Sequence, residues 1–260
     1  MHKRAALVVL AAAVALIVVL MGASGALATS KPPYGIKPTP KPKPKPKPKS
    51  SRYNVTTKVA IAINENAIYR RPTTKSDVVK QLAFYTPDGE ALQTYRFVKS
   101  RRVGRTQWEL IDVPARPNGQ SGWVKRSWLG AARISHTLVL VDIDARTVIV
   151  YKHGKQVFST PAGVGKPTTP TPTGHFWVAE AFPSQNPFYG PWAFGTTDYA
   201  ADTEFPDGSI VGLHGTDAPE LIPGDPSHGC IRFKDADILQ MKKFVSIGSA
   251  VWIEYSPALS

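Results

Sequence analysis

The sequence contains one cysteine, Cys230, in the stretch SHGCIR (227–232), and a histidine precedes it by two positions. A second histidine, His214, stands sixteen positions before the cysteine, at the end of the apolar stretch IVGL. A free thiol has a pKa of about 8.5, so a nucleophilic cysteine needs a neighbouring base or cation at neutral pH. A histidine can accept the thiol proton and then stabilise the thiolate as imidazolium, so that the pair can rest ionised. These residue types predict a cysteine nucleophile that attacks a carbonyl carbon.

Two glycines beside these residues have a role through their backbone. Gly229 has no side chain, so a carbonyl substrate can approach the main chain, and the amides of Gly229 and Cys230 are expected to point at the developing oxyanion. Gly215 follows His214 and leaves a carbonyl oxygen to orient the second imidazole nitrogen. The two short segments therefore contain the parts of an acyl-transfer site.

Two other roles for the cysteine stay open. It could be a small buried apolar residue, or it could bind zinc together with His214 and His228. Structural zinc usually takes four ligands and often paired cysteines, while the sequence has no second cysteine. We therefore expect no metal at this site, and the acyl-transfer chemistry needs no cofactor.

The elements that must position these residues lie in a strand-rich segment of residues 134–255. The runs LVLVDI (138–143) and TVIVYK (147–152) flank Asp144-Ala145-Arg146 and predict a hairpin. Prolines in the stretch GVGKPTTPTPTGHFWV exclude regular structure before Phe176. One helix is expected, with Asp235 as its N-cap. Its apolar positions are Ile238, Leu239, Met241, Phe244 and Val245.

Residues 55–130 predict a second, smaller β domain, because short apolar runs alternate with turn residues. The order AIYRRPTTKSDVV, TQWELIDV and SGWVKRSWL resembles bacterial Src-homology-3-like barrels. That resemblance implies binding of wall peptide or glycan. Trp108, Trp123 and Trp128 could stack on sugars, although core packing is the commoner role of such aromatic residues.

The strongest resemblance is to the L,D-transpeptidase catalytic domain, also called YkuD-like. It rests on LHGT (213–216), SHGCIR and the upstream TPTGHF (171–176). The resemblance implies that Cys230 is the nucleophile and His214 the base, with the Gly215 carbonyl orienting it. His228 then lies in the wall beside the thiol. Residues assigned to the substrate side or to loop support are Arg232, Ser227, Tyr189 and Trp192, the last two with core packing or lid structure as the alternative.

The fold class expected is therefore mostly β. A small Src-homology-3-like barrel precedes a β-sandwich catalytic domain with one packed helix. The resemblance implies attack on the bond between the diamino acid and D-Ala of a peptidoglycan stem, and transfer to a side-chain amine of another stem as a 3,3 cross-link. Carboxypeptidase action, other acyl transfer by the same cysteine, and an inactive wall-binding protein are the alternatives. Carbapenems are expected to acylate Cys230.

The N-terminal part predicts export. Within residues 1–30, His2, Lys3 and Arg4 precede the run from Ala5 to Ala28, 24 residues without a charge, which is typical of a signal peptide or a membrane anchor. Residues 31–54 are a Lys/Pro-rich linker, expected to extend as polyproline II over roughly 60 Å. Nine of the 32 basic residues lie in the first 50 positions, with no acid. Two interpretations of this basic segment stay open: a spacer with no specific partner, and a segment that binds an anionic cell-wall polymer. Nucleic acid is disfavoured, because an exported protein seldom meets it. We expect the protein in the cell wall or at the outer face of the membrane.

Overall fold

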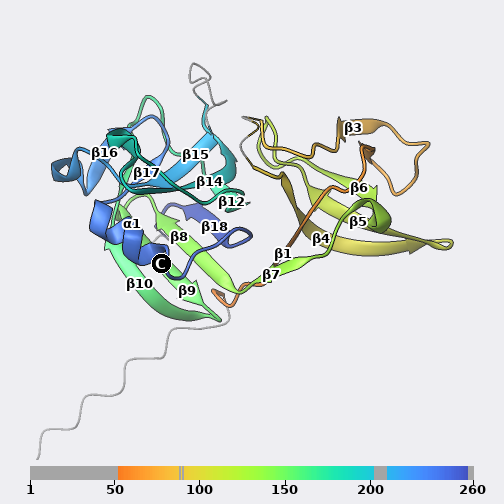
Figure 1. The fold of residues 1–260 in the computed structure, drawn as a ribbon, viewed down its shortest axis with the longest axis horizontal. Coiled ribbons are helices and arrows are strands. Elements are labelled where there is room, and N and C mark those ends of the chain that lie inside the picture. Colours follow the sequence, from red (N-terminus) through yellow and green to blue (C-terminus); the bar gives the residue numbers. More distant parts are fainter. Residues whose placement is uncertain (1–51, 88, 90, 202–209, 257–260) are drawn as a thin grey trace, which may run out of the picture. The chain divides into compact units, whose positions relative to one another are not determined.

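The computed structural model describes residues 52–87, 89, 91–201 and 210–256, all within the unit Pro46–Ser260 of the two units that make up the chain. The expected export segment, and the linker up to residue 51, lie outside the described residues. The described chain is mostly β, with three sheets and one short α-helix, α1 (Asp235–Met241) (Figure 1). No helix within the described ranges is long and apolar enough to cross a membrane.

The first sheet is antiparallel and has the order β3-β2-β6-β5-β4-β1-β7. Its strands are β1 (Thr57–Ile61), β2 (Ala67–Tyr69), β3 (Val78–Gln81), β4 (Thr94–Val103), β5 (Thr106–Asp112), β6 (Ser121–Lys125) and β7 (Arg133–Ser135), with a 3-10 helix, η1 (Arg126–Trp128), after β6. Its core includes Ile68, Ile111 and Val124, each fully buried. Ile111 of β5 and Val124 of β6 turn to this core on one face of the sheet, while the buried Trp108 and Trp123 lie on the other face.

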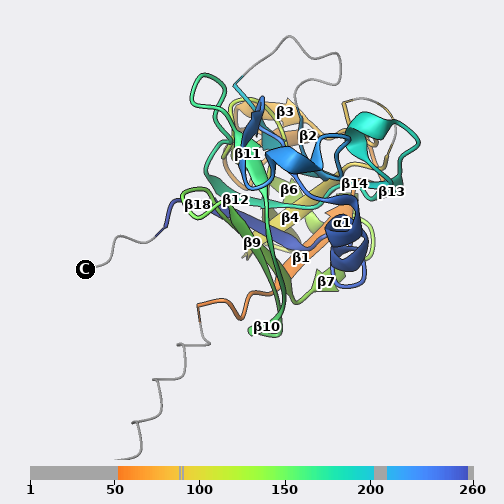
Figure 2. The same ribbon diagram turned by 90° about the vertical axis from the view of Figure 1, so that its left-hand side faces the viewer.

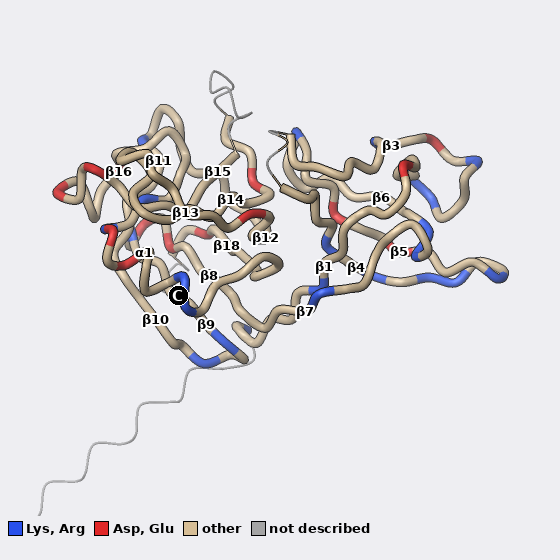
Figure 3. Tube along the Cα trace, in the orientation of Figure 1, with Lys and Arg blue, Asp and Glu red and all other residues tan. Residues whose placement is uncertain are grey.

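The aromatic residues of this sheet belong mainly to its interior. Trp108 is 4% exposed and Trp123 is 8% exposed, while Trp128 is half-buried and lies under the Lys125 ammonium. Core packing, the commoner role, therefore accounts for Trp108 and Trp123. Basic side chains instead gather on the β4–β5 hairpin, where four exposed residues, Lys99, Arg101, Arg102 and Arg105, lie close in sequence (Figure 3).

The second sheet has the order β10-β9-β8-β18-β12. Its strands are β8 (Thr137–Asp142), β9 (Thr147–Lys152), β10 (Lys155–Pro161), β12 (Gly174–Trp177) and β18 (Ala250–Glu254). The expected hairpin over residues 138–152 is confirmed, because β8 and β9 pair antiparallel in full register. β18 then returns parallel to β8. This central pair is rich in Val, Leu and Ile, which suits strands that are covered on both faces.

The third sheet has the order β13-β14-β15-β17-β11-β16. Its strands are β11 (Gly163–Gly165), β13 (Phe182–Pro183), β14 (Trp192–Tyr199), β15 (Ile210–His214), β16 (Gly224–Ser227) and β17 (Ile231–Arg232), with 3-10 helices η2 (Pro187–Tyr189) and η3 (Pro219–Leu221) between them. Apolar side chains of the second and third sheets, together with Ile238 and Met241 of α1, form one core. Each large apolar side chain in it contributes roughly 1.5–3 kcal/mol through burial.

The helix is shorter than the sequence predicts and is not capped as expected. Lys234 is the N-cap residue of α1 and makes no side-chain cap, while Asp235 occupies the first turn. Leu239 is 41% exposed, so it does not belong to the buried side. The helix contacts β14 and β15 through its apolar side (Figure 2).

Candidate active site

The site lies on one face of the third sheet, where β14, β15 and β17 are neighbours. Leu213 of β15 pairs with Ile231 of β17, and both side chains are fully buried in the core. Since side chains alternate along a strand, His214 and Cys230 turn to the opposite face. The parallel pairing of β15 with β17 is what brings the two residues together across sixteen positions of sequence.

A small cavity of about 130 Å³ opens on this face. The residues that line it are Glu180, Phe182, Tyr189, Ala193, Phe194, Gly195, Ile210, Gly212, His214 and Cys230. Gly212 forms part of its floor. A Cβ at this position would lie 3.4 Å from His214 Cδ2 and 3.8 Å from Cys230 Sγ. The edge of the imidazole ring that carries Nε2 and the sulfur therefore both lie over Gly212, whose amide donates to Sγ at 3.4 Å.

His214 is held in one tautomer. Its Nδ1 lies 2.6 Å from the carbonyl oxygen of Gly215, and because a carbonyl only accepts, Nδ1 carries the proton. Nε2 is buried and has no hydrogen-bond partner among the described residues. This nitrogen therefore presents its lone pair at the cavity that holds the thiol. Aromatic rings fix the imidazole from the sides, with Phe188 stacked at 5.8 Å and Tyr189 edge-on at 4.9 Å.

The protonation state of His214 differs from the one that the sequence suggested. Burial lowers its pKa from 6.5 to about 4, the hydrogen bond to Gly215 opposes this shift, and the positive charge of Arg232 adds to it. The imidazole is therefore neutral at neutral pH. A resting thiolate–imidazolium pair is disfavoured, because the imidazolium would have to form in a site that is 99% shielded from solvent. The pair is better described as a thiol beside a neutral imidazole that can accept its proton.

The turn before Cys230 is held by Ser227, whose side chain is fully buried. Its hydroxyl donates to the Cys230 carbonyl at 2.6 Å and accepts from the Gly229 amide at 3.1 Å. The Gly229 amide is thus engaged inside the turn and does not point at an oxyanion, contrary to the expectation from sequence. Gly229 is required for another reason: its φ is +126°, and a Cβ there would lie 2.9 Å from the Ala200 side chain.

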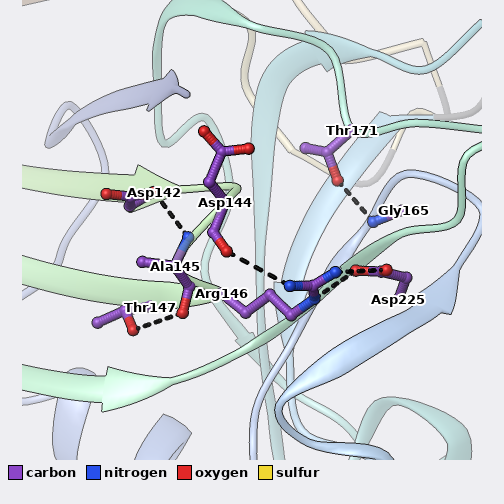
Figure 4. Close-up of polar contacts among 8 residues, drawn as sticks. All are labelled: Asp142, Asp144, Ala145, Arg146, Thr147, Gly165, Thr171 and Asp225. Atoms are coloured by element: carbon purple, nitrogen blue, oxygen red, sulfur yellow. Dashed lines mark hydrogen bonds and ion pairs between the residues drawn. The ribbon is translucent and has the colours of Figure 1, made fainter. Parts of the chain in front are cut away.

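Two supports of this turn were not identified from the sequence. Thr171, in the TPTGHF loop, accepts from the Gly165 amide at 2.9 Å and donates to the Gly229 carbonyl at 2.9 Å. Arg146, in the β8–β9 turn, binds both carboxylate oxygens of Asp225, just before the SHGC stretch, at 2.7 and 2.8 Å (Figure 4). This bidentate contact lowers the pKa of Asp225 and ties β16 to the neighbouring hairpin.

A third support lies behind His214. The Asp235 carboxylate accepts from the Thr216 amide at 3.1 Å, immediately after the LHGT stretch. A side chain at Gly215 would collide with this carboxylate, and so would one at Gly190. Asp235 therefore supports the turn that carries His214, which is a role that only the contact between α1 and β15 could reveal.

The remaining expected site residues lie in different surroundings. His228 is exposed, outside the lining of the cavity, with its Nε2 2.7 Å from Lys166 Nζ. Arg232 is 9% exposed and lies over the Phe188 ring, at 4.6 Å from its centroid. Tyr189 lines the cavity, but Trp192 packs against the core under the Lys242 ammonium. Of the two aromatic residues assigned to substrate contact, one therefore reaches the cavity.

The zinc site that the sequence left open would need His214, His228 and Cys230 to converge. Among the described residues, no group of three or more His, Cys, Asp or Glu side chains is arranged to hold a metal ion. His228 lies outside the lining of the cavity that holds His214 and Cys230, with its Nε2 2.7 Å from Lys166 Nζ.

The part of the chain that carries this site is similar to a known family. Residues 136–253 match the L,D-transpeptidase catalytic domain, YkuD. Two proteins that bear the name L,D-transpeptidase YkuD, from Bacillus licheniformis and Bacillus subtilis, are 30% and 31% identical to this chain over 116 and 115 residues. Each match covers 44% of this chain and 64% of the relative, so the chain spans less than two thirds of their length.

A solved structure is also similar. The catalytic domain of an L,D-transpeptidase from E. faecium is 29% identical, with a TM-score of 0.35, and the match covers 45% of this chain and 96% of that one. The matched residues in the family comparison include His214, Cys230 and the strands that carry them. The segment 136–253 therefore matches the YkuD L,D-transpeptidase catalytic domain in sequence.

Proposed function

We propose that the protein remodels peptidoglycan as an L,D-transpeptidase with Cys230 as the nucleophile and His214 as the general base. The donor is a stem tetrapeptide, and the bond broken joins the third residue, a diamino acid, to the terminal D-Ala. The acceptor is a side-chain amine of another stem, which gives a 3,3 cross-link. No cofactor takes part.

In the first half of the reaction, the Cys230 thiol passes its proton to Nε2 of His214 as the sulfur attacks the amide carbon. The Gly212 amide, 3.4 Å from Sγ, stabilises the negative sulfur as it forms. The backbone amide of Cys230 is the donor that we assign to the oxyanion, because the Gly229 amide is bonded to Ser227. The C–N bond then breaks, and D-Ala leaves with the proton held by His214.

In the second half, the acceptor amine attacks the thioester carbon and displaces the sulfur. His214 takes a proton from the amine and returns it to the thiolate, so the enzyme ends in its starting state. The thioester keeps the acyl energy of the broken amide. For this reason the exchange of one amide for another needs no ATP.

One observation carries this proposal. A buried imidazole with a fixed tautomer presents its basic nitrogen to a cavity that also holds the single thiol of the chain. A structural cysteine would not need a neutral base with an unfilled hydrogen-bond position beside it. The family match of residues 136–253 supplies the substrate class.

The experiment is mass spectrometry of muropeptides after incubation of the protein with tetrapeptide-containing monomers. Dimers joined between third residues, with release of D-Ala, are expected. Tripeptides alone would assign carboxypeptidase action to the same cysteine. The Cys230→Ala variant should lose D-Ala release and keep its sedimentation with purified cell wall, and persistent release would refute the nucleophile assignment.

We also propose a wall-binding role for residues 55–130, as a Src-homology-3-like module, and a location in the wall or at the outer membrane face. The exposed basic side chains of the β4–β5 hairpin favour an anionic polymer, as does the Lys-Pro tract. Binding should therefore weaken as the salt concentration rises. Sedimentation with cell wall, stripped or not stripped of its anionic polymers, measures this, and equal binding to both would refute the polymer assignment.

A further inference from the structure

Arg232 is a buried cation that the proposed reaction does not use. It is 9% exposed, and its Nε is buried with no hydrogen-bond partner in the described part of the chain. None of the ion pairs between described residues includes it. A buried charge is costly unless a group of opposite charge and hydrogen bonds come to it, so this guanidinium points to an anionic group in the substrate.

The pairing of the strands places Arg232 beside both the base and the nucleophile. Arg232 of β17 pairs directly with His214 of β15, and directly paired side chains project from the same face of a sheet. The two Cα atoms are therefore about 4.8 Å apart, which is the spacing of neighbouring strands. Cys230 precedes Arg232 by two positions, so it shares that face, and the Cα atoms of these two residues are at most about 7 Å apart.

The ring of Phe188 connects the cation to the base. It stacks on the His214 imidazole with 5.8 Å between ring centroids, and the Arg232 guanidinium lies 4.6 Å from its centroid. The Asn186 side chain accepts from the Phe188 amide at 3.1 Å and so fixes this residue in η2. The positive charge of Arg232 also lowers the pKa of His214, as expected for neighbouring groups. A guanidinium that stacks on a ring directs its N–H groups to the side, where a carboxylate can accept two of them.

We propose that Arg232 binds the terminal carboxylate of the donor stem, the carboxylate of the D-Ala that leaves. This inference rests on the proposed function. The carbon of that carboxylate is three bonds from the amide carbon that Cys230 attacks, which is a distance of at most about 4 Å. An arginine side chain extends about 7 Å from its Cα, so the guanidinium can reach this carboxylate while the sulfur reaches the amide carbon. The carboxylate exists only where D-Ala is the last residue, so Arg232 makes the site select stems that end there.

The test is a competition between two tetrapeptide donors in one reaction. One donor ends in the free carboxylate of D-Ala, the other ends in a carboxamide, and all other groups of the two stems are the same. Mass spectrometry counts the two leaving groups, D-Ala and D-alaninamide. We expect the parent protein to prefer the free carboxylate by about 10- to 100-fold, as for a charge-assisted hydrogen bond.

Variants separate the charge of Arg232 from its packing. Arg232→Met keeps the length of the side chain and a contact with Phe188 without the charge, and it should reduce the preference to about threefold or less. Arg232→Gln is a second neutral variant and should do the same. Arg232→Lys keeps the charge without the two-pronged geometry and should give an intermediate preference. Lys155→Met removes an exposed cation of β10 in the same domain and should leave the preference unchanged.

An independent readout shows whether the nucleophile survives these changes. Iodoacetamide is a neutral reagent without a carboxylate, so its reaction with Cys230 does not depend on the proposed contact. Intact mass should show alkylation of the neutral variants at pH 7 within about threefold of the parent rate, as expected if the thiol and its base remain in place. A loss of carboxylate preference with parental alkylation is therefore a loss of recognition.

The outcomes are distinct. If the parent releases D-Ala and D-alaninamide equally, or if both neutral variants retain the preference, the inference is wrong although the proposed function stands. If the neutral variants lose instead a preference for a carboxylate elsewhere in the stem, the assignment to D-Ala is overturned. If the parent releases neither leaving group, the proposed function itself fails.

Discussion

At pH 5.5 the imidazole of His214 should still be about 97% neutral, since burial holds its pKa at about 4. An imidazole with the ordinary pKa of 6.5 would be about 9% neutral at the same pH. The rate of thiol acylation depends on the neutral base, so the two cases differ by about tenfold in rate at this pH. The shift corresponds to about 3 kcal/mol against the charged imidazole.

The assay is the rate of Cys230 acylation by a carbapenem between pH 3.5 and 8, followed by intact mass. The acid limb should have its midpoint near pH 4, with nearly the full rate at pH 5.5. His214→Gln should lower the rate about 10²- to 10⁴-fold at pH 7 and remove this limb, because the proton acceptor is gone.

A midpoint near pH 6.5 would refute the argument that burial keeps the base neutral. An unchanged rate in His214→Gln would refute the assignment of the base. Stability gives an independent check, because the unfolded state takes up a proton near pH 6.5 and the folded state does not until about pH 4. The His214 contribution to the free energy of unfolding is therefore present above pH 6.5 and is lost as the pH falls toward 4.

Three further changes test a buried carboxylate of β14, Asp198, and two supports of the turn before Cys230. Burial raises the pKa of Asp198 to about 7, so ionisation in the unfolded state lowers stability as the pH rises from about 4 to 7. Asp198→Asn should therefore raise the free energy of unfolding by up to about 4 kcal/mol at pH 8 and change it little at pH 4. Urea denaturation measures this, and an equal effect at both pH values would contradict the argument. Thr171→Val leaves the Gly165 amide and the Gly229 carbonyl without their partner and should lower the free energy of unfolding by about 1–3 kcal/mol. The control Thr168→Val, at an exposed position, should change it little in the same assay. Gly229→Ala forces φ +126° on an alanine, so it should lower the free energy of unfolding by about 1–3 kcal/mol and remove most of the carbapenem acylation rate. A variant that is acylated at the parental rate would show that the turn tolerates a side chain.

Local patterns were enough for the β8–β9 hairpin and for the two residues at the centre of the site. They were wrong for β11, which lies in the proline-rich stretch that was expected to lack regular structure before Phe176. The β8–β9 hairpin follows from two Val/Ile-rich runs around a short polar turn. His214 at the end of an apolar strand, sixteen positions before a single cysteine, indicated the pair that the cavity contains. Both inferences depend on residue types within short stretches of sequence, because these determine which side chains alternate along a strand and where the chain turns.

The sequence was least informative about which of several possible hydrogen-bond partners each polar group takes. Ser227 engages the Gly229 amide, so the oxyanion donor expected from the glycine is already bonded. His228 is two positions before the cysteine in the sequence, but it contacts Lys166, which lies 62 positions away. Asp235 was expected to cap a helix and instead supports the turn after His214. In each case several hydrogen-bond partners were possible in the local sequence, and the packing selected one.

Residue types alone therefore establish a cysteine–histidine pair, a mostly β chain and a mild positive charge beyond the basic N-terminal part. The protonation state of His214 and the position of Arg232 beside it were decided only by the tertiary structure. The first depends on how completely solvent is removed from the imidazole, which is a property of the packed core. The second depends on the register of β17 against β15, and a one-residue change of register reverses the face on which a side chain lies.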